Sequence, residues 1–349
     1  MQDTYVTNVD TPRLVKALIE KVKPDLIVLT GDQIKGYGIY FNFGSERKNA
    51  DTTLTNLLKP IAESNIPFTA VFGNHDEFGS ATKDFQWSIY NRYENFIGEN
   101  FDVDFVELKE GNETKFVVYL FDTVLDSEGH YVNLSSETIK KFEDIQEALF
   151  KKCKKYIPAI AFQHIPPEEI YSCLKVSDKP QKGYFQGAGK YSDKYYTMPD
   201  YAKNDRSFMG ENAAVLCNTK EQLDALCKHD DVKGLYFGHD HNNSFVVKYN
   251  NLDLGYTQGC GFNVYGPGKN RGGRVFEINS EDGTYETYTV TEGDLDNFKE
   301  KRIIKNFLYT HSPSSVGEAK KWAKKAAKIG GAALLGTLAI YKIIKVASK

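Results

Sequence analysis

Gly73-Asn74-His75-Asp76 and Gly238-His239-Asp240-His241 are the two stretches that decide the fold of this 349-residue chain. Each follows an apolar run that is typical of a buried strand, residues 67–72 before the first stretch and residues 234–237 before the second. Imidazole, carboxylate and carboxamide groups are metal ligands. Both stretches therefore predict metal-binding side chains at the end of a strand.

Two further positions repeat this arrangement. Asp32 follows the apolar run of residues 25–30, and His164 follows the run of residues 157–162. Ligand-type residues at four strand ends, separated by helical stretches, predict an α/β layered protein that builds a polynuclear metal site.

The remaining pattern predicts the other elements. Helix–strand alternation in the first half of the chain favours parallel strands joined by right-handed crossovers. The fold class predicted is α/β, a two-sheet β-sandwich flanked by helices in four layers, α/β/β/α, with ligands at the carboxyl ends of strands. Thr219-x-x-Gln222 predicts a helix capping box, and residues 174–212 predict a long loop or flap. Helices are expected near 11–23, 51–63, 135–156 and after 219, and strands near 103–108, 116–121, 245–249, 252–257, 274–278 and 284–290.

Net charge and cysteine content limit the classes of binding partner and of covalent cross-link that are expected. With 44 Lys and Arg against 47 Asp and Glu, the net charge is -3, so no general basic field for nucleic acid is expected. The five cysteines form no C-x-x-C pair and predict ordinary thiols rather than a disulfide framework, which leaves the cellular compartment open.

The chain divides into three parts. Residues 1–310 are expected to form one domain, residues 311–320 a linker, and residues 321–349 a tail that is first basic and then apolar. Three interpretations of the tail stay open: a membrane-spanning helix from Ile329 to Val346, a basic helix lying on an anionic lipid surface, or a soluble helix or frayed end. Membrane association is therefore one candidate partnership.

The ligand-type residues fit one kind of chemistry. Hydrolysis of a phosphate ester needs a nucleophile at neutral pH and neutralisation of charge on the phosphoryl oxygens. Two divalent ions about 3.5–4 Å apart supply both, by acidifying a bridging water and clamping the attacking and leaving oxygens. Asp32 suits the bridging carboxylate and Asn74 the carboxamide ligand. The imidazole ligands would be His164, His239 and His241.

Two more pairs of residues are candidates at such a site. His75 is left over as a non-ligand beside Asp76, which could orient and charge it as the general acid for the leaving alcohol. Lys269 and Arg271 are candidates for binding the substrate phosphate, with a solvated turn as the equal alternative.

The ordered set Gly31-Asp32, Gly73–Asp76, His164 and Gly238–His241 resembles the calcineurin-like metallophosphoesterase superfamily. The surrounding residues resemble its purple-acid-phosphatase-like subgroup, over roughly residues 10–290. These surroundings are residues 23–33, 163–168, 238–243 and 266–271.

The resemblance implies two metal sites that share Asp32. The second site would use residues matching Asp32, Asn74, His164 and His239. The first would use Asp32 and the residue matching His241, together with an Asp-x-His on the first strand of the family fold.

This chain departs from that pattern in two places. No histidine precedes His75, so the Asp-x-His strand is expected to be missing, with Met1 in the loop after it and an N-terminally truncated domain. Members with an iron–tyrosinate centre place Tyr three residues after the bridging Asp, where this chain has Lys35. A tyrosinate-bound Fe(III) is thus not expected, and the mixed nitrogen and oxygen ligands favour Mn²⁺, Zn²⁺ or Fe²⁺.

The resulting prediction is a metal-dependent phosphatase with a dinuclear centre and a bridging hydroxide. It would hydrolyse phosphomonoesters of small molecules or of phosphoproteins. The alternative is a catalytically impaired metallophosphatase-like pseudoenzyme that acts as a binding protein, because its first metal site lacks the Asp-x-His ligands.

Overall fold

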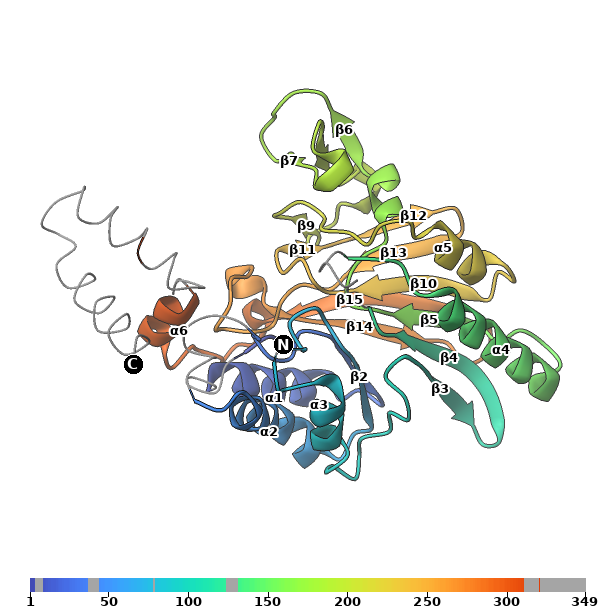
Figure 1. The fold of residues 1–349 in the computed structure, drawn as a ribbon, viewed down its shortest axis with the longest axis horizontal. Helices are drawn as coiled ribbons and strands as arrows, with labels where there is room; N and C mark the ends of the chain where they lie inside the picture. Colours follow the sequence, from blue (N-terminus) through green and yellow to red (C-terminus); the bar gives the residue numbers. More distant parts are fainter. Residues whose placement is uncertain (4–8, 37–43, 78, 124–130, 311–319, 321–349) are drawn as a thin grey trace, which may run out of the picture.

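A large mixed sheet forms one of the two central layers of the protein (Figure 1). The computed structural model describes residues 1–3, 9–36, 44–77, 79–123, 131–310 and 320. In this sheet the four inner strands are parallel, and β12 and β3 are antiparallel edges. The strand order is β12 (Val246–Tyr249), β13 (Leu252–Tyr256), β10 (Val232–Phe237), β5 (Ala159–Phe162), β4 (Glu113–Phe121) and β3 (Val103–Glu110).

The second central layer consists of two strand pairs. β1 (Ile27–Thr30) runs parallel to β2 (Phe68–Val71), and β14 (Gly272–Ile278) is antiparallel to β15 (Tyr285–Thr291). Val28 and Phe276 from this layer pack on Phe162 and Tyr236 of the large sheet, so an apolar core joins the two layers. The predicted sandwich is confirmed.

Helices cover both outer faces, which completes the four layers. α1 (Asp10–Val22), α2 (Glu46–Ser64) and α3 (Lys83–Tyr90) bury their apolar faces in the core of the β1–β2 layer. α4 (Ser136–Cys153) and α5 (Lys220–Cys227) cover the large sheet with residues such as Phe142 and Leu223. A further helix, α6 (Ile303–Thr310), follows the last strand. α3 was not predicted, because its eight residues give too short a pattern to read.

The segment predicted as a loop or flap has a fold of its own, which we call the insertion (residues 175–209). It contains the three-stranded sheet β6 (Lys175–Ser177), β8 (Tyr195–Thr197) and β7 (Phe185–Gln186), which projects at the top of Figure 1. Its last strand, β9 (Phe208–Met209), returns to the body and pairs with β11 (Asn243–Ser244). Short 3-10 turns span Glu168–Cys173, Gly189–Tyr191, Asp200–Ala202, Gly268–Asn270 and Glu292–Asp294.

The predicted capping box at Thr219 is wrong. The Thr219 hydroxyl makes no cap hydrogen bond to α5. Instead it accepts from the amide of Glu168 at 3.1 Å and donates to the carboxylate of Glu169, so it joins α5 to the turn that follows the His164 loop. A tertiary partner has outcompeted the local cap.

The predicted linker and tail at the C-terminal end of the chain stay predictions. The predicted tail, residues 321–349, and all of the predicted linker except Lys320 lie outside the described residues. Among the helices of the described part, none combines the length and apolar character that a membrane crossing requires. Membrane association through Ile329 to Val346 stays a prediction.

A buried ion pair beside the site should give stability a measurable pH dependence. Asp122, at the end of β4, pairs with Lys83 of α3 at 2.5 Å, and burial raises the pKa of Asp122 to about 6 although Lys83 opposes the shift. A carboxyl group whose folded pKa exceeds its unfolded value stabilises the fold below the unfolded pKa, and this contribution is lost as the pH rises through the folded pKa. Between pH 4 and 6.5 the wild type should lose about 2 kcal/mol of unfolding free energy relative to Asp122→Asn, since each pKa unit is worth about 1.4 kcal/mol and the contribution is not complete at pH 4. Urea unfolding of both proteins across this range measures the difference, and parallel pH profiles would contradict it.

Candidate metal centre

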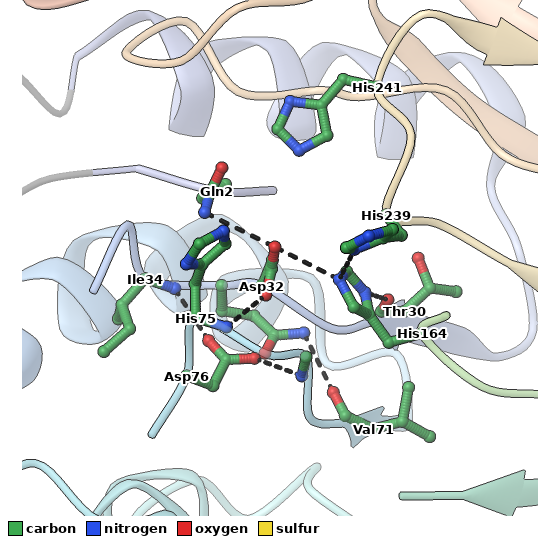
Figure 2. Close-up of polar contacts among 12 residues, drawn as sticks. Gln2, Thr30, Asp32, Ile34, Val71, His75, Asp76, His164, His239 and His241 are labelled. Carbon is green, nitrogen blue, oxygen red and sulfur yellow. Dashed lines mark hydrogen bonds and ion pairs between the residues drawn. The ribbon is translucent and has the colours of Figure 1, made fainter. Parts of the chain in front are cut away.

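Three loops bring Asp32, His164 and His239 together at the carboxyl ends of strands (Figure 2). Asp32 follows β1, Asn74 follows β2, His164 follows β5 and His239 follows β10. Among the described residues, Asp32, His164 and His239 form a group whose ligand atoms all lie within 4.8 Å of one another. Strands from both central layers thus contribute to one site.

The distances within this group suit a shared cation. His164 Nε2 lies 3.2 Å from Asp32 Oδ2, and His239 Nδ1 lies 3.3 Å from the same His164 nitrogen. Ligand atoms about 2.0–2.2 Å from one tetrahedral ion are separated by roughly 3.3–3.5 Å. The three side chains are therefore close to the spacing that one ion requires.

Two glycines of the ligand motifs are required because ligand side chains lie too close to their Cα atoms to leave room for a Cβ. A Cβ on Gly31 would lie 2.5 Å from the His164 ring, and a Cβ on Gly73 would lie 2.2 Å from Asp32 Oδ1. Asp32 and His239 themselves have left-handed backbones, with φ of 51° and 66°. Such φ values are unusual for non-glycine residues and occur where the surrounding structure imposes them, often at functional sites.

Main-chain carbonyls orient two of the imidazoles. His164 Nδ1 lies 2.8 Å from the carbonyl oxygen of Thr30, and His241 Nδ1 lies 2.9 Å from that of Tyr265. A carbonyl partner makes the Nδ1 atom the protonated one and leaves Nε2 with its lone pair, as a metal ligand needs.

Asn74 provides an independent indication of a cation. Its carboxamide oxygen is buried and has no hydrogen-bond partner. An orphaned buried acceptor costs free energy unless a ligand satisfies it. The donor set of Asp32, Asn74, His164 and His239 thus fits a divalent ion of the Mn²⁺, Zn²⁺ or Fe²⁺ type.

The pKa shifts of Asp32 and His239 favour the protonation states that metal binding requires, an ionised carboxylate and a neutral imidazole. Burial opposes ionisation of Asp32, but His164 outweighs it and holds the pKa of Asp32 below its usual range. Burial lowers the pKa of His239 well below its usual value, so this imidazole is neutral at pH 7. For His164, burial lowers the pKa, but the carboxylate of Asp32 raises it more, and a metal ion competes with that proton for the same nitrogen.

His75 lies beside Asp32 in Figure 2, on the side away from His164 and His239. Its amide donates to Asp32 Oδ1 at 2.9 Å, which ties the two loops together. Burial lowers the pKa of His75, with Asp32 opposing the shift.

Asp76 joins two of the ligand loops through main-chain hydrogen bonds. Its Oδ1 accepts from the amide of Ile34 at 3.0 Å, and its Oδ2 accepts from the amide of Gly73 at 2.8 Å. These bonds use both carboxylate oxygens to fix the two loops that carry Asp32 and Asn74. The contacts give Asp76 a positioning role, and the predicted orientation of the His75 imidazole stays a prediction.

His241 lies apart from the other ligands in Figure 2, above Asp32 and His239. Gln2 Nε2 is 3.5 Å from Asp32 Oδ2, and Gln2 and His241 line the same cavity beside Asp32. In the described residues β1 pairs with β2 only, and Asp3 makes a single parallel bridge to Ile34. Within this part of the chain, Asp32 and His241 are the only predicted ligands at the first metal position.

Lys35, which stands where the iron–tyrosinate members have Tyr, is not suited to bind a metal. Lys35 Nζ donates to the carbonyl oxygen of Asn263 at 3.3 Å, and burial lowers the pKa of Lys35 to about 8 while Asp3 opposes the shift. An ammonium group has no lone pair to offer a metal.

The two predicted phosphate-binding residues differ in their surroundings. The Arg271 guanidinium is buried and donates to the carbonyl oxygens of Gly261 at 2.7 Å and Val264 at 3.1 Å. Lys269 is exposed on the Gly268–Asn270 turn. The contacts of Arg271 therefore make it a support of the 261–268 loop.

Two other residues at the centre, Thr30 and Gln2, were not identified from the sequence, whereas Tyr265 was considered as a residue that lines the cleft or simply packs. The Thr30 carbonyl orients His164, the Tyr265 carbonyl orients His241, and Gln2 contacts Asp32. Main-chain acceptors carry no side-chain signature, so no sequence pattern pointed to the two carbonyl contacts.

The fold and the site together define a four-layer α/β protein with a candidate metal centre at its strand ends. A comparison with protein families matches the calcineurin-like phosphoesterase family over residues 3–243. The chain belongs to this family, whose characteristic centre holds two divalent metals.

Curated relatives include purple acid phosphatase-like proteins. The chain is 24% identical over 309 residues to the probable inactive purple acid phosphatase 28 of Arabidopsis thaliana, covering 78% of this chain and 68% of the relative. It is also 24% identical over 292 residues to the probable inactive purple acid phosphatase 29 of the same plant, covering 76% and 67%. Phosphatase DCR2 of Saccharomyces cerevisiae is 24% identical over 334 residues, covering 88% of this chain and 52% of the relative.

Among solved structures, a dimetal phosphatase from Danio rerio is similar with a TM-score of 0.44 and 12% identity. The match covers 80% of this chain and 83% of the zebrafish chain.

Proposed function

We propose that this protein is a metal-dependent phosphatase that hydrolyses phosphomonoesters, of small molecules or of phosphoproteins. The observation that carries the proposal is the convergence of Asp32, His164 and His239 on one another, and the buried, unpartnered carboxamide oxygen of Asn74 supports it. Family membership supports a hydrolase of phosphoesters, and the particular phosphatase activity is our inference.

Each of these residues has a part in holding the centre. Asp32, Asn74, His164 and His239 would hold one divalent ion, and Asp32 with His241 would contribute to a second. When bound, such ions acidify water and neutralise charge on the phosphoryl oxygens. Asp76 keeps the loops of Asp32 and Asn74 in register through its two main-chain hydrogen bonds.

His75 is proposed as the general acid. Its imidazole lies beside Asp32 at the edge of the ligand group, which suits transfer of a proton from a ring nitrogen to the oxygen of the leaving alcohol (Figure 2). Burial lowers the pKa of His75 and the negative charge of Asp32 offsets this shift only in part, so the proposed acid role rests on the position of the ring.

A second candidate is a metal-binding protein without turnover. It is favoured by the incomplete first position, where Asp32 and His241 are the only predicted ligands among the described residues. The names of the two plant relatives, which are called probable inactive, agree with this alternative.

Turnover by the full chain separates the two candidates. Metal-depleted protein reconstituted with Mn²⁺ or Zn²⁺ is expected to hydrolyse p-nitrophenyl phosphate, and the metal-depleted protein is not. His75→Ala should lower kcat/KM on an alkyl phosphate by about 100-fold or more, since general acid catalysis contributes about 10²–10⁴-fold. The loss should be smaller on p-nitrophenyl phosphate, because nitrophenolate leaves without a proton.

The control for this substitution is His229→Ala. His229 stacks on Tyr156 near the start of β10, at the opposite end of that strand from the ligand loop. Equal losses on both substrates would contradict the acid role of His75. The absence of any metal-dependent turnover in the wild type would favour the metal-binding candidate.

A further inference from the structure

The root of the insertion is bonded to the loop that carries His239 and His241. We call residues 208–214 the insertion root and residues 238–244 the ligand loop. β9 in the root pairs with β11 of the ligand loop, and the Gly210 amide donates to the Asn242 carbonyl at 2.8 Å. The Ala214 amide donates to the Asp240 carboxylate at 3.1 Å. The ligand loop is thus held along one side by the root of the insertion.

Glu211 in the root contacts the ligand loop directly after His241. Its carboxylate accepts a 2.6 Å hydrogen bond from the amide of Asn242, the residue that follows His241. The same carboxylate is hydrogen-bonded to the hydroxyl of Tyr265. Glu211 therefore links the insertion, the ligand loop and Tyr265.

Tyr265 contacts His241 in two ways. Its carbonyl oxygen lies 2.9 Å from His241 Nδ1, and its ring stacks on the imidazole with centroids 4.4 Å apart and planes within 14°. His241 itself is buried, whereas 42% of the Tyr265 surface is exposed. An exposed ring held against a buried imidazole contributes less to a core than to the orientation of its neighbour.

Support of this kind affects metal affinity directly. Partners that orient a ligand imidazole typically account for about 10–100-fold in affinity. His164 takes its orientation from Thr30 at the end of β1, within the sheet layer. His241 depends on a loop residue, which is in turn held by the root of the insertion. We therefore expect a change at Glu211 to alter the orientation of His241 more than that of His164.

We propose that Glu211 and Tyr265 are positioning residues that orient His241 toward the ion it shares with Asp32, and that they couple the insertion to the affinity for this ion. The inference rests on the proposed function in assuming that His241 is a metal ligand. It assigns the insertion a role in occupancy of the weaker metal position, which Asp32 and His241 would form.

The experiment measures the affinity of each metal position in the full chain. Metal-depleted protein is titrated with Zn²⁺ alone in competition with a chelator, for the wild type, Glu211→Ala, Tyr265→Phe, Tyr265→Leu and the double variant Glu211→Ala/Tyr265→Phe. Two dissociation constants are expected for the wild type. In Glu211→Ala and Tyr265→Leu the weaker constant should rise about 10–100-fold, and the tighter constant should stay within twofold.

The double variant tests the hydrogen bond between the two residues. Because Glu211→Ala and Tyr265→Phe each remove that bond, their effects on the weaker constant should be far from additive. Matched controls are Glu277→Ala and Tyr288→Leu, a Glu–Tyr pair bonded at 2.7 Å on the β14–β15 hairpin, which should change neither constant.

The outcomes are distinct. Unchanged metal affinity in Glu211→Ala and Tyr265→Leu, with only a lower melting temperature, would show a purely structural role and overturn the inference. Equal weakening of both constants would also overturn it. A wild type that takes up one ion overturns the inference but leaves the centre of Asp32, Asn74, His164 and His239 intact, whereas a wild type that takes up none defeats the proposed function itself.

Discussion

Asp32→Asn is expected to lower kcat/KM for p-nitrophenyl phosphate by at least about 1,000-fold, which corresponds to about 4 kcal/mol of transition-state stabilisation. The substitution keeps the shape of the side chain but removes the charge at which the ligand group converges. His164 would lose its 3.2 Å ion pair, and the carboxamide would offer one oxygen where the carboxylate offers two. Steady-state kinetics at saturating Mn²⁺ or Zn²⁺ measure the loss.

The matched control is Asp51→Asn. Asp51 lies on α2 and pairs with Arg92 at the surface, where an exposed ion pair is worth at most about 1 kcal/mol. This variant should keep wild-type kinetics. Retention of more than a tenth of the activity by Asp32→Asn, with metal bound, would show that Asp32 is not the shared ligand.

Arg271→Ala is expected to lower the free energy of unfolding by about 3–5 kcal/mol, the range for leaving buried polar partners uncompensated. The guanidinium donates to the carbonyl oxygens of Gly261, Val264 and Gly268, at 2.7, 3.1 and 3.4 Å. Its removal leaves these acceptors without their charged donor and opens a cavity against Phe262, because the guanidinium carbon lies 5.2 Å from the centroid of that ring. Urea unfolding gives the change in free energy.

Lys269→Ala is the control for this prediction, because its side chain is exposed on the neighbouring turn. Its unfolding free energy should stay within about 0.5 kcal/mol of the wild type. If Arg271→Ala keeps wild-type stability and instead raises KM, the phosphate-binding role predicted from the sequence is right and the structural role is wrong.

Much of the fold followed from local patterns. The strands before Asp32, Asn74, His164 and His239 were predicted because apolar runs that end in Gly and ligand-type residues have a local signature. The later strands β12 to β15 were predicted within about two residues, from alternation and turn residues. The order of these elements was enough to predict that Asp32, His164 and His239 converge.

The contacts that organise the centre could not be predicted in the same way. Asp76 and Arg271 form hydrogen bonds with main-chain groups of loops that lie up to 42 residues earlier in the chain. No local sequence pattern indicates either of these hydrogen bonds. Glu211 contacts the ligand loop 31 residues later in the chain. Such roles depend on how loops meet in space, which the periodicity of a sequence does not encode.

Uptake of Zn²⁺ by the isolated full chain, measured by equilibrium dialysis with metal analysis, tests the central claim most directly. The wild type is predicted to retain at least one ion per chain at micromolar free Zn²⁺, and His164→Ala is predicted to lose it, while His229→Ala keeps it. Retention of no ion by the wild type, or equal retention by the wild type and His164→Ala, would contradict the assignment of Asp32, Asn74, His164 and His239 as a metal centre.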